Sequence, residues 1–173
     1  AVTVTAEFEK ITYAITIETA DNGKVTSDKE IAAKDDTVTL TVEPDAEYKL
    51  KSLVVKGTDE VDVTEVDGTY TFTMPAEAVT VTAEFEKITY AITIDEIANG
   101  TVAADVTEAA EGDTVTLTVT PDTGFKLATL TGATFSPEVS ADVTEYTFVM
   151  GAADVTIGAT FEETEPDVEG YEV

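Results

Sequence analysis

The chain of 173 residues contains no cysteine, histidine, arginine or tryptophan. The absence of cysteine excludes disulfide bonds and thiolate chemistry. The absence of histidine removes the usual general base near neutral pH and the commonest ligand of transition metals. These absences argue against an enzyme, but they do not identify a cellular compartment, because many exported domains also lack cysteine.

Basic side chains are scarce as well. Nine lysines face 36 acidic residues, which gives a formal net charge of −27 at pH 7. Such a charge repels phosphate backbones and anionic lipid headgroups, so nucleic-acid binding is close to excluded. The simplest interpretation of the acidic surface is solubility and resistance to self-association. The alternative is a surface that attracts calcium or a basic partner.

Long apolar segments are also missing. No stretch approaches the length of a membrane span, and the first residues lack the charged-then-apolar pattern of a signal peptide. We therefore expect no direct insertion into a membrane.

The sequence does contain a long internal repeat. Residues 1–17 are identical to residues 78–94, at a spacing of 77. Tandem arrays of near-identical small modules usually serve length, surface coverage or multivalent contact rather than a single reactive centre. The function of the chain has to be interpreted with this in mind.

The spacing of the repeat changes once along the chain. Leu53 and Leu130 are 77 residues apart, whereas Tyr70 and Tyr146 are 76 apart, so one residue is deleted between Leu130 and Tyr146. We expect this deletion to lie in a loop, because a one-residue slip inside a strand would exchange its two faces.

The repeat divides the chain into four parts. Residues 1–10 match 78–87 and are interpreted as the last strand of a preceding repeat, so we expect the chain to be a fragment of a longer protein. Two full modules follow at 11–87 and 88–163. Residues 164–173 form an acidic tail without a strand pattern, expected to be disordered. Residues 1–10 could pair with their own first module or dock into a neighbouring molecule as a donated strand.

Strict alternation of apolar and polar residues predicts the secondary structure. Val38, Leu40 and Val42 alternate with threonines, and the same pattern recurs in 79–85 and 90–94. Alternation of β-branched residues is typical of half-buried antiparallel strands. Short strands separated by turn residues predict an all-β fold of two small antiparallel sandwiches or open barrels.

The same alternation identifies a set of inward-facing residues in each module. In the first module the candidates for the core are Tyr13, Ile15, Ile17, Val25, Val38, Leu40, Val42, Tyr48, Leu50, Leu53, Tyr70, Phe72, Met74, Val79, Val81 and Phe85.

The joint between the modules is short. Only Glu86 and Lys87 separate the predicted strand that ends at Phe85 from the one that begins at Ile88, and no Gly/Ser-rich spacer is present. We therefore expect the modules to form an elongated, stiff rod, in which neighbouring repeats of the chain are each other's partners.

The order of the motifs resembles a known family. Tyr-x-Ile-Thr-Ile, Asn-Gly-x-Val, Asp-Thr-Val-Thr-Leu-Thr-Val, Tyr-x-Phe-x-Met and Val-Thr-x-x-Ala-x-Phe occur in this order in both modules. This order is similar to the divergent internalin B-repeat family of bacterial surface proteins. The resemblance implies an extracellular, mostly β module found in tandem in surface proteins and adhesins, with no catalytic residues and no binding site general to the family.

The first module departs from that pattern at two glycines of the second. Asp35 replaces Gly112, and Glu47 replaces Gly124. Aspartate tolerates a left-handed backbone conformation, whereas glutamate does so poorly. We therefore expect the turn that contains Glu47 to differ from its counterpart.

Calcium is the cofactor most compatible with the acidic loops. The candidate ligands, in loop segments rich in oxygen, are Asp21, Asp28, Asp59 and Asp62. None of these segments has the ligand spacing of a known calcium loop, and turn chemistry alone accounts for Asp and Asn at such positions. The prediction is no cofactor, with calcium as the alternative.

Other chemistry is disfavoured by the residues themselves. A glycosidase-like pair of carboxylates needs a cleft for a sugar, and modules of this size leave little room for one. The only asparagines, Asn22 and Asn99, precede glycines and mark hairpin turns, so we expect no Lys–Asn crosslink. The repeated aromatic residues fall on the inward-facing positions of the alternating pattern, which favours packing in the core over a sugar-binding platform.

The leading hypothesis is a non-catalytic tandem-repeat segment of a bacterial cell-surface protein or adhesin, acting outside the cell as a semi-rigid stalk or spacer. The alternative is a binding module for a glycan or a host protein, possibly assisted by calcium.

Overall fold

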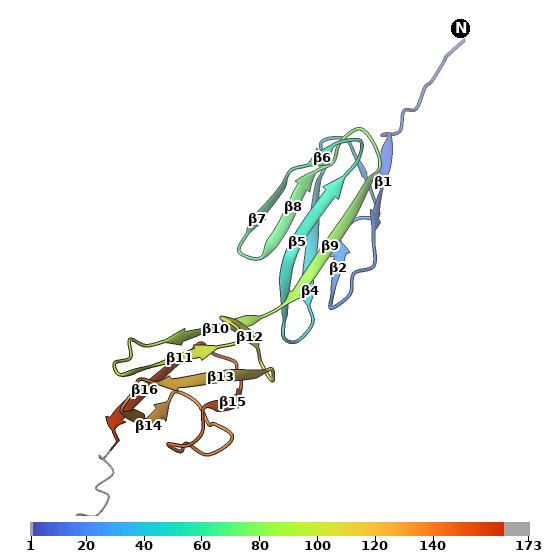
Figure 1. The fold of residues 1–173 in the computed structure, drawn as a ribbon. Helices are drawn as coiled ribbons and strands as arrows, with labels where there is room; N and C mark the ends of the chain where they lie inside the picture. The colour runs from blue at the N-terminus through green and yellow to red at the C-terminus, as the bar shows by residue number, and fades with distance from the viewer. Residues whose placement is uncertain (1, 165–173) are drawn as a thin grey trace, which may run out of the picture. The chain divides into compact units, whose positions relative to one another are not determined.

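The computed structural model describes residues 2–164, and all the regular structure in this range is β (Figure 1). The chain divides into two units between Lys87 and Ile88, called unit 1 and unit 2 below. Residues 2–164 contain no helix that is long and apolar enough to cross a membrane. The tail predicted at 165–173 lies outside the described residues.

Unit 1 consists of nine strands. They are β1 (Thr12–Ile17), β2 (Gly23–Ser27), β3 (Ile31–Ala33), β4 (Thr37–Pro44), β5 (Tyr48–Lys56), β6 (Glu60–Val61), β7 (Val63–Val66), β8 (Thr69–Thr73) and β9 (Val79–Lys87).

The strands of unit 1 form two sheets, of order β3-β1-β9-β5-β6 and β2-β4-β8-β7. Val55 and Val81 of the first sheet and Val38 and Leu40 of the second are fully buried in one apolar cluster. The unit is therefore a β-sandwich, and neither sheet closes into a barrel.

The predicted antiparallel sandwich is confirmed except that one strand pair in each unit is parallel. β1 pairs with β9 in parallel, with Ile15 opposite Val79 and Ile17 opposite Val81. The other strand pairs of the unit are antiparallel. Alternating side chains do not distinguish the two directions, because successive residues point to opposite faces in both kinds of pair.

Unit 2 repeats this topology with fewer strands. They are β10 (Thr89–Ile94), β11 (Gly100–Ala104), β12 (Glu108–Ala110), β13 (Thr114–Pro121), β14 (Phe125–Thr131), β15 (Glu145–Val149) and β16 (Val155–Glu163). The sheets have the orders β12-β10-β16-β14 and β11-β13-β15, and β10 pairs with β16 in parallel.

Unit 2 has no counterpart of β6 and β7 among its described residues. Residues 132–144 form a loop instead, which has an isolated β-bridge to β15 between Ser136 and Thr147. The predicted deletion between Leu130 and Tyr146 lies in this loop, as expected.

The predicted core is largely confirmed. Eight of the sixteen candidates in unit 1 are buried, and the other eight are half-buried. Val55 is fully buried and was not predicted, and Ala32 and Ala33 were also missed. No polar or charged residue within 2–164 is buried, so both cores are built from apolar side chains.

The expected difference between the two repeated turns is wrong. Glu47 has φ 69° and Gly124 has φ 87°, so both residues adopt the left-handed conformation. Tyr48 N–H donates to Asp45 O at 3.1 Å, and the equivalent Phe125 N–H donates to Asp122 O at 3.0 Å. The surrounding strands fix the turn strongly enough to hold glutamate in a backbone conformation that is unfavourable for this residue.

Residues 2–11 form no strand, unlike their copy in β9. The side chains of Val2, Val4 and Phe8 are 94%, 87% and 94% exposed. Lys10 contacts unit 1 through an ion pair of 3.3 Å between its Nζ and Asp36 Oδ1. Donation of residues 1–10 to a neighbouring molecule stays a prediction.

Candidate functional site

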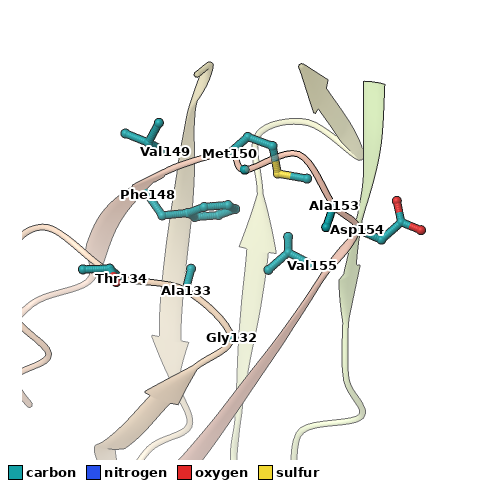
Figure 2. Close-up of a pocket in the computed structure, with 10 residues that line it drawn as sticks. Gly132, Ala133, Thr134, Phe148, Val149, Met150, Ala153, Asp154 and Val155 are labelled. Carbon is teal, nitrogen blue, oxygen red and sulfur yellow. The ribbon is translucent and has the colours of Figure 1, made fainter. Parts of the chain in front are cut away.

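One pocket of unit 2 lies where β14 ends beside the connection from β15 to β16 (Figure 2). Its volume is about 420 Å³. The apolar side chains that line it include Phe148 and Met150, which are only 3% and 2% exposed. The lining residues are Gly132, Ala133, Thr134, Phe148, Val149, Met150, Gly151, Ala153, Asp154 and Val155.

The polar groups of this pocket do not converge. Asp154 supplies the only carboxylate of the lining. Its Oδ1 accepts a hydrogen bond of 2.8 Å from Ala91 N–H, and Figure 2 shows the carboxylate directed away from Phe148 and Met150. A hydrolase would need a second acid or a nucleophile within reach of the same point. The lining supplies no second acid, and its only hydroxyl is that of Thr134.

Comparison with unit 1 shows how the pocket lining differs at Gly132. The counterpart of Gly132 in unit 1, 77 residues earlier, is Val55, which is fully buried. Gly132 has φ 109°, and a Cβ there would lie 2.1 Å from Thr156 O. Gly132 follows the end of β14 and lies close against β16, and it lines the pocket without a side chain of its own.

In unit 1 a carboxylate binds the loop that follows β5. Glu77 Oε1 accepts from Thr58 N–H at 3.0 Å, and Glu77 Oε2 accepts from Thr58 Oγ1 at 2.5 Å. These hydrogen bonds, the one from the hydroxyl first, hold the pKa of Glu77 below its usual value. The residue at the corresponding place in unit 2 is Ala153, which cannot form this contact.

Two of the acids that occur in both units act as backbone acceptors. Asp28 Oδ1 accepts from Thr39 N–H at 2.8 Å, and the equivalent Asp105 Oδ1 accepts from Thr116 N–H at 2.9 Å. These contacts join the end of one strand to its neighbour in the sheet, β2 to β4 in unit 1 and β11 to β13 in unit 2. They account for the repetition of the two acids without any ligand.

A second repeated acid stabilises the turn before β4 and before β13. Asp36 Oδ2 accepts from Ala33 N–H at 3.1 Å, as Asp113 Oδ2 does from Ala110 N–H. The bond from Ala33 N–H, followed by the contact with Lys10, lowers the pKa of Asp36. The lowered pKa marks a structural acceptor on the surface.

The predicted calcium ligands are not gathered in one place. Asp21 lies in the turn after β1, and Asp28 lies beyond β2 with one carboxylate oxygen already bonded to Thr39. Asp59 and Asp62 flank the short strand β6. Within residues 2–164, no three acidic side chains are arranged to hold a metal ion. Calcium binding therefore stays a prediction.

The repeated aromatic residues contribute to the cores. Phe72 and Phe148 are each 3% exposed, while Phe85 and Phe161 are half-buried against the same clusters. Tyr48 is half-buried at the start of β5. These rings do not form a flat exposed platform for a sugar.

One residue that packs beside the pocket, Phe135, was missed because it has no aromatic counterpart in the other repeat. Phe135 packs edge-on against Tyr146 and Phe148, with ring centroids 6.3 and 6.1 Å apart. Tyr146 Oη donates to Ser140 O at 2.7 Å and fixes the other side of the loop. An aromatic residue in the segment where the repeat spacing changes was the available signal for this anchoring.

Comparison with known families decides the assignment. The sequence profile of the divergent InlB B-repeat domain matches residues 13–89 and again 90–165. The chain belongs to this family. Each match spans one of the two sandwiches, so unit 1 and unit 2 are tandem B-repeats. A comparison with curated proteins found no match. B-repeats typically occur in surface proteins of bacteria and are usually non-catalytic.

Proposed function

We propose that the chain is a non-catalytic segment of a bacterial cell-surface protein in which the two B-repeats act as a semi-rigid extracellular spacer. The observation that carries this proposal is the length of the connection between the repeats. β9 ends at Lys87 and β10 begins at Thr89, so a single residue, Ile88, lies between them. One residue in an extended chain leaves few backbone torsions about which the repeats can reorient.

The surface of each unit supports a structural role. The ion pairs of the described residues join exposed side chains on single units, for example Lys49 with Glu86 and Lys126 with Glu162. Exposed pairs of this kind contribute little to stability and create no reactive centre. The remaining acidic side chains keep like units apart by mutual repulsion, which suits a spacer.

A distance measurement tests the proposal. Thr41 and Thr118 are exposed and equivalent positions of the two repeats, and the chain has no native cysteine. Spin labels on Thr41→Cys and Thr118→Cys should give one narrow distance distribution in pulsed electron paramagnetic resonance.

The matched control carries a Gly/Ser insertion of about six residues after Lys87, which makes the connection a flexible coil. Its distance distribution should be much broader. Equally broad distributions with and without the insertion would contradict a semi-rigid spacer.

The second candidate function is a ligand-binding module for a glycan or a host protein. The pocket beside Gly132 favours it, because this glycine stands where unit 1 has the buried side chain of Val55. Chemical-shift changes confined to the signals of Ala133, Val149 and Met150 on adding a glycan or a host protein would support this function over the spacer.

A further inference from the structure

The first and last strands of each repeat are neighbours that run in the same direction (Figure 1). The chain enters unit 1 through β1 and leaves it through β9, and three consecutive residues of β1 lie opposite three of β9. Unit 2 has the same arrangement between β10 and β16. The paired residues are Ile15–Val79, Thr16–Thr80 and Ile17–Val81 in unit 1, and Ile92–Val155, Thr93–Thr156 and Ile94–Ile157 in unit 2.

We propose that each repeat is a shear clamp that resists tension along the chain, a role that rests on the proposed spacer function. Tension pulls β1 toward its N-terminal end and β9 toward its C-terminal end. Because the strands are parallel, these two directions are opposite, and the strands can separate only by sliding past each other. All hydrogen bonds of the pair then carry the load together.

An antiparallel pair at the same place would behave differently. The entering end of the first strand and the leaving end of the last strand would lie at one end of the pair. Tension would then open the hydrogen bonds one after another, starting from that end. The parallel direction of the β1–β9 pair is therefore the feature that makes the repeat resistant to tension. The other strand pairs of unit 1 do not share this direction.

Hydrogen bonds hold β1 on both sides. Ile15 N–H donates to Glu30 O at 2.9 Å on the side of β3, while Glu18 N–H donates to Val81 O at 2.9 Å and extends the parallel pair. Unit 2 repeats both bonds, from Ile92 N–H to Thr107 O and from Asp95 N–H to Ile157 O. The load-bearing strand is thus not a free edge in either repeat.

The paired strands lie over the core, which protects their hydrogen bonds from water. Val79 is 2% exposed, Val81 is fully buried, and Ile15 is 9% exposed. β9 also pairs with β5 from Tyr48 to Lys56, so the load on β9 passes into the middle of a five-stranded sheet. Sliding of β1 along β9 would have to expose these apolar side chains at the same time.

Single-molecule force measurements with two attachment geometries test the clamp in the full chain. The chain has no native cysteine, so introduced pairs are unique handles. Glu9→Cys with Lys87→Cys applies tension along the direction of shear in unit 1. Glu18→Cys with Glu84→Cys, both exposed and at the same end of the β1–β9 pair, pulls the strands apart sideways. The rupture force should fall by half or more in the second geometry. Equal forces in both geometries would overturn the clamp.

A pair of matched substitutions gives an independent test with tension along the chain. The N–H of Thr16 points to the same side of β1 as the N–H of Glu18. Thr16→Pro therefore removes a donor that faces β9. The N–H of Thr26 points to the same side as the N–H of Asp28, which donates to Thr39 O. Thr26→Pro therefore removes a donor between β2 and β4. Both variants should lower the melting temperature of unit 1, but only Thr16→Pro should lower its rupture force several-fold.

Forced unfolding follows the unfolding rate rather than equilibrium stability, so the two readouts can separate. Parallel losses of rupture force and melting temperature in both variants would contradict the clamp. If Thr16→Pro does not fold, the comparison of geometries still decides. If the rupture force were the same in both geometries while the spin-label distance distribution stayed narrow, the clamp would be contradicted and the spacer function would still be supported. The two proposals therefore fail on different measurements.

Discussion

The ring of Phe85 lies directly over Gly23, so close that a Cβ built on Gly23 would be 2.6 Å from Phe85 Cζ. Phe161 covers Gly100 in the same way in the second repeat. Neither glycine has a positive φ, although the preceding Asn22 and Asn99 do, with φ 63° and 65°. The glycine is therefore required by the approach of an aromatic ring and not by the turn itself.

Gly23→Ala should destabilise unit 1 by about 1–3 kcal/mol, because the new methyl group overlaps the ring and forces the strands to shift. Chemical denaturation followed by tyrosine fluorescence measures this loss. Gly151→Ala is the matched control, since a Cβ there meets nothing within 4 Å and its φ is not positive. Gly23→Ala combined with Phe85→Leu should recover part of the loss. An unchanged midpoint in Gly23→Ala would show that the ring can move aside freely.

Glu47→Gly should stabilise unit 1, because Glu47 is held at φ 69°. A left-handed conformation costs a residue with a Cβ about 1–2 kcal/mol, and glycine does not have this cost. The greater freedom of glycine in the unfolded chain offsets part of the gain. Thermal unfolding should show a higher melting temperature for unit 1.

The opposite change in the second repeat provides the control for this prediction. Gly124→Ala should destabilise unit 2, although a Cβ at Gly124 meets no atom within 4 Å. Backbone strain would then be the cause rather than a clash. A lower melting temperature in Glu47→Gly would mean that the glutamate side chain contributes a contact that outweighs the strain.

Local patterns predicted the strands and their inward faces, as Val38, Leu40 and Val81 demonstrate. They did not reveal the role of Gly23, because its constraint comes from Phe85, far away in the sequence. The parallel pairing of β1 with β9 was also beyond them, since alternation is the same for either direction. Such long-range relationships depend on how distant strands meet.

The pocket could not be predicted for a related reason. The sequence locates the deletion between Leu130 and Tyr146, but a missing residue does not say which contacts are lost. Val55 and Gly132 are aligned by the repeat, yet the consequence depends on the proximity of Thr156 O to Gly132. The prediction for the turn at Glu47 was wrong because it rested on the low propensity of glutamate for a left-handed conformation. The tertiary structure outweighs this propensity.

The pKa of Glu77 is lowered from a reference of 4.5, so its contacts with Thr58 stabilise unit 1 when the carboxyl is ionised. This stability is present above the unfolded value and is lost as pH falls through the lower folded value. Glu77→Gln should therefore lower the melting temperature of unit 1 at pH 7, and the difference from wild type should shrink below about pH 4.5.

The difference between the two proteins is the quantity to follow, because protonation of many other acids changes the stability of both in the same way. Glu60→Gln, at an exposed carboxyl on β6, is the matched control and should differ little from wild type at any pH. A Glu77→Gln difference that is constant from pH 7 to pH 3 would mean that ionisation of Glu77 does not strengthen its contacts with Thr58.

Calcium should stabilise the protein no more than magnesium does. Both ions screen the net charge of −27, and this screening alone should raise the melting temperature slightly. Selective binding of calcium needs six to eight oxygen ligands around one ion, whereas Asp21, Asp28, Asp59 and Asp62 lie in separate segments. Melting curves in equal millimolar concentrations of the two chlorides, at constant ionic strength, provide the measurement. A larger shift with calcium, abolished by Asp59→Asn with Asp62→Asn but not by Asp21→Asn, would instead locate a specific site beside β6.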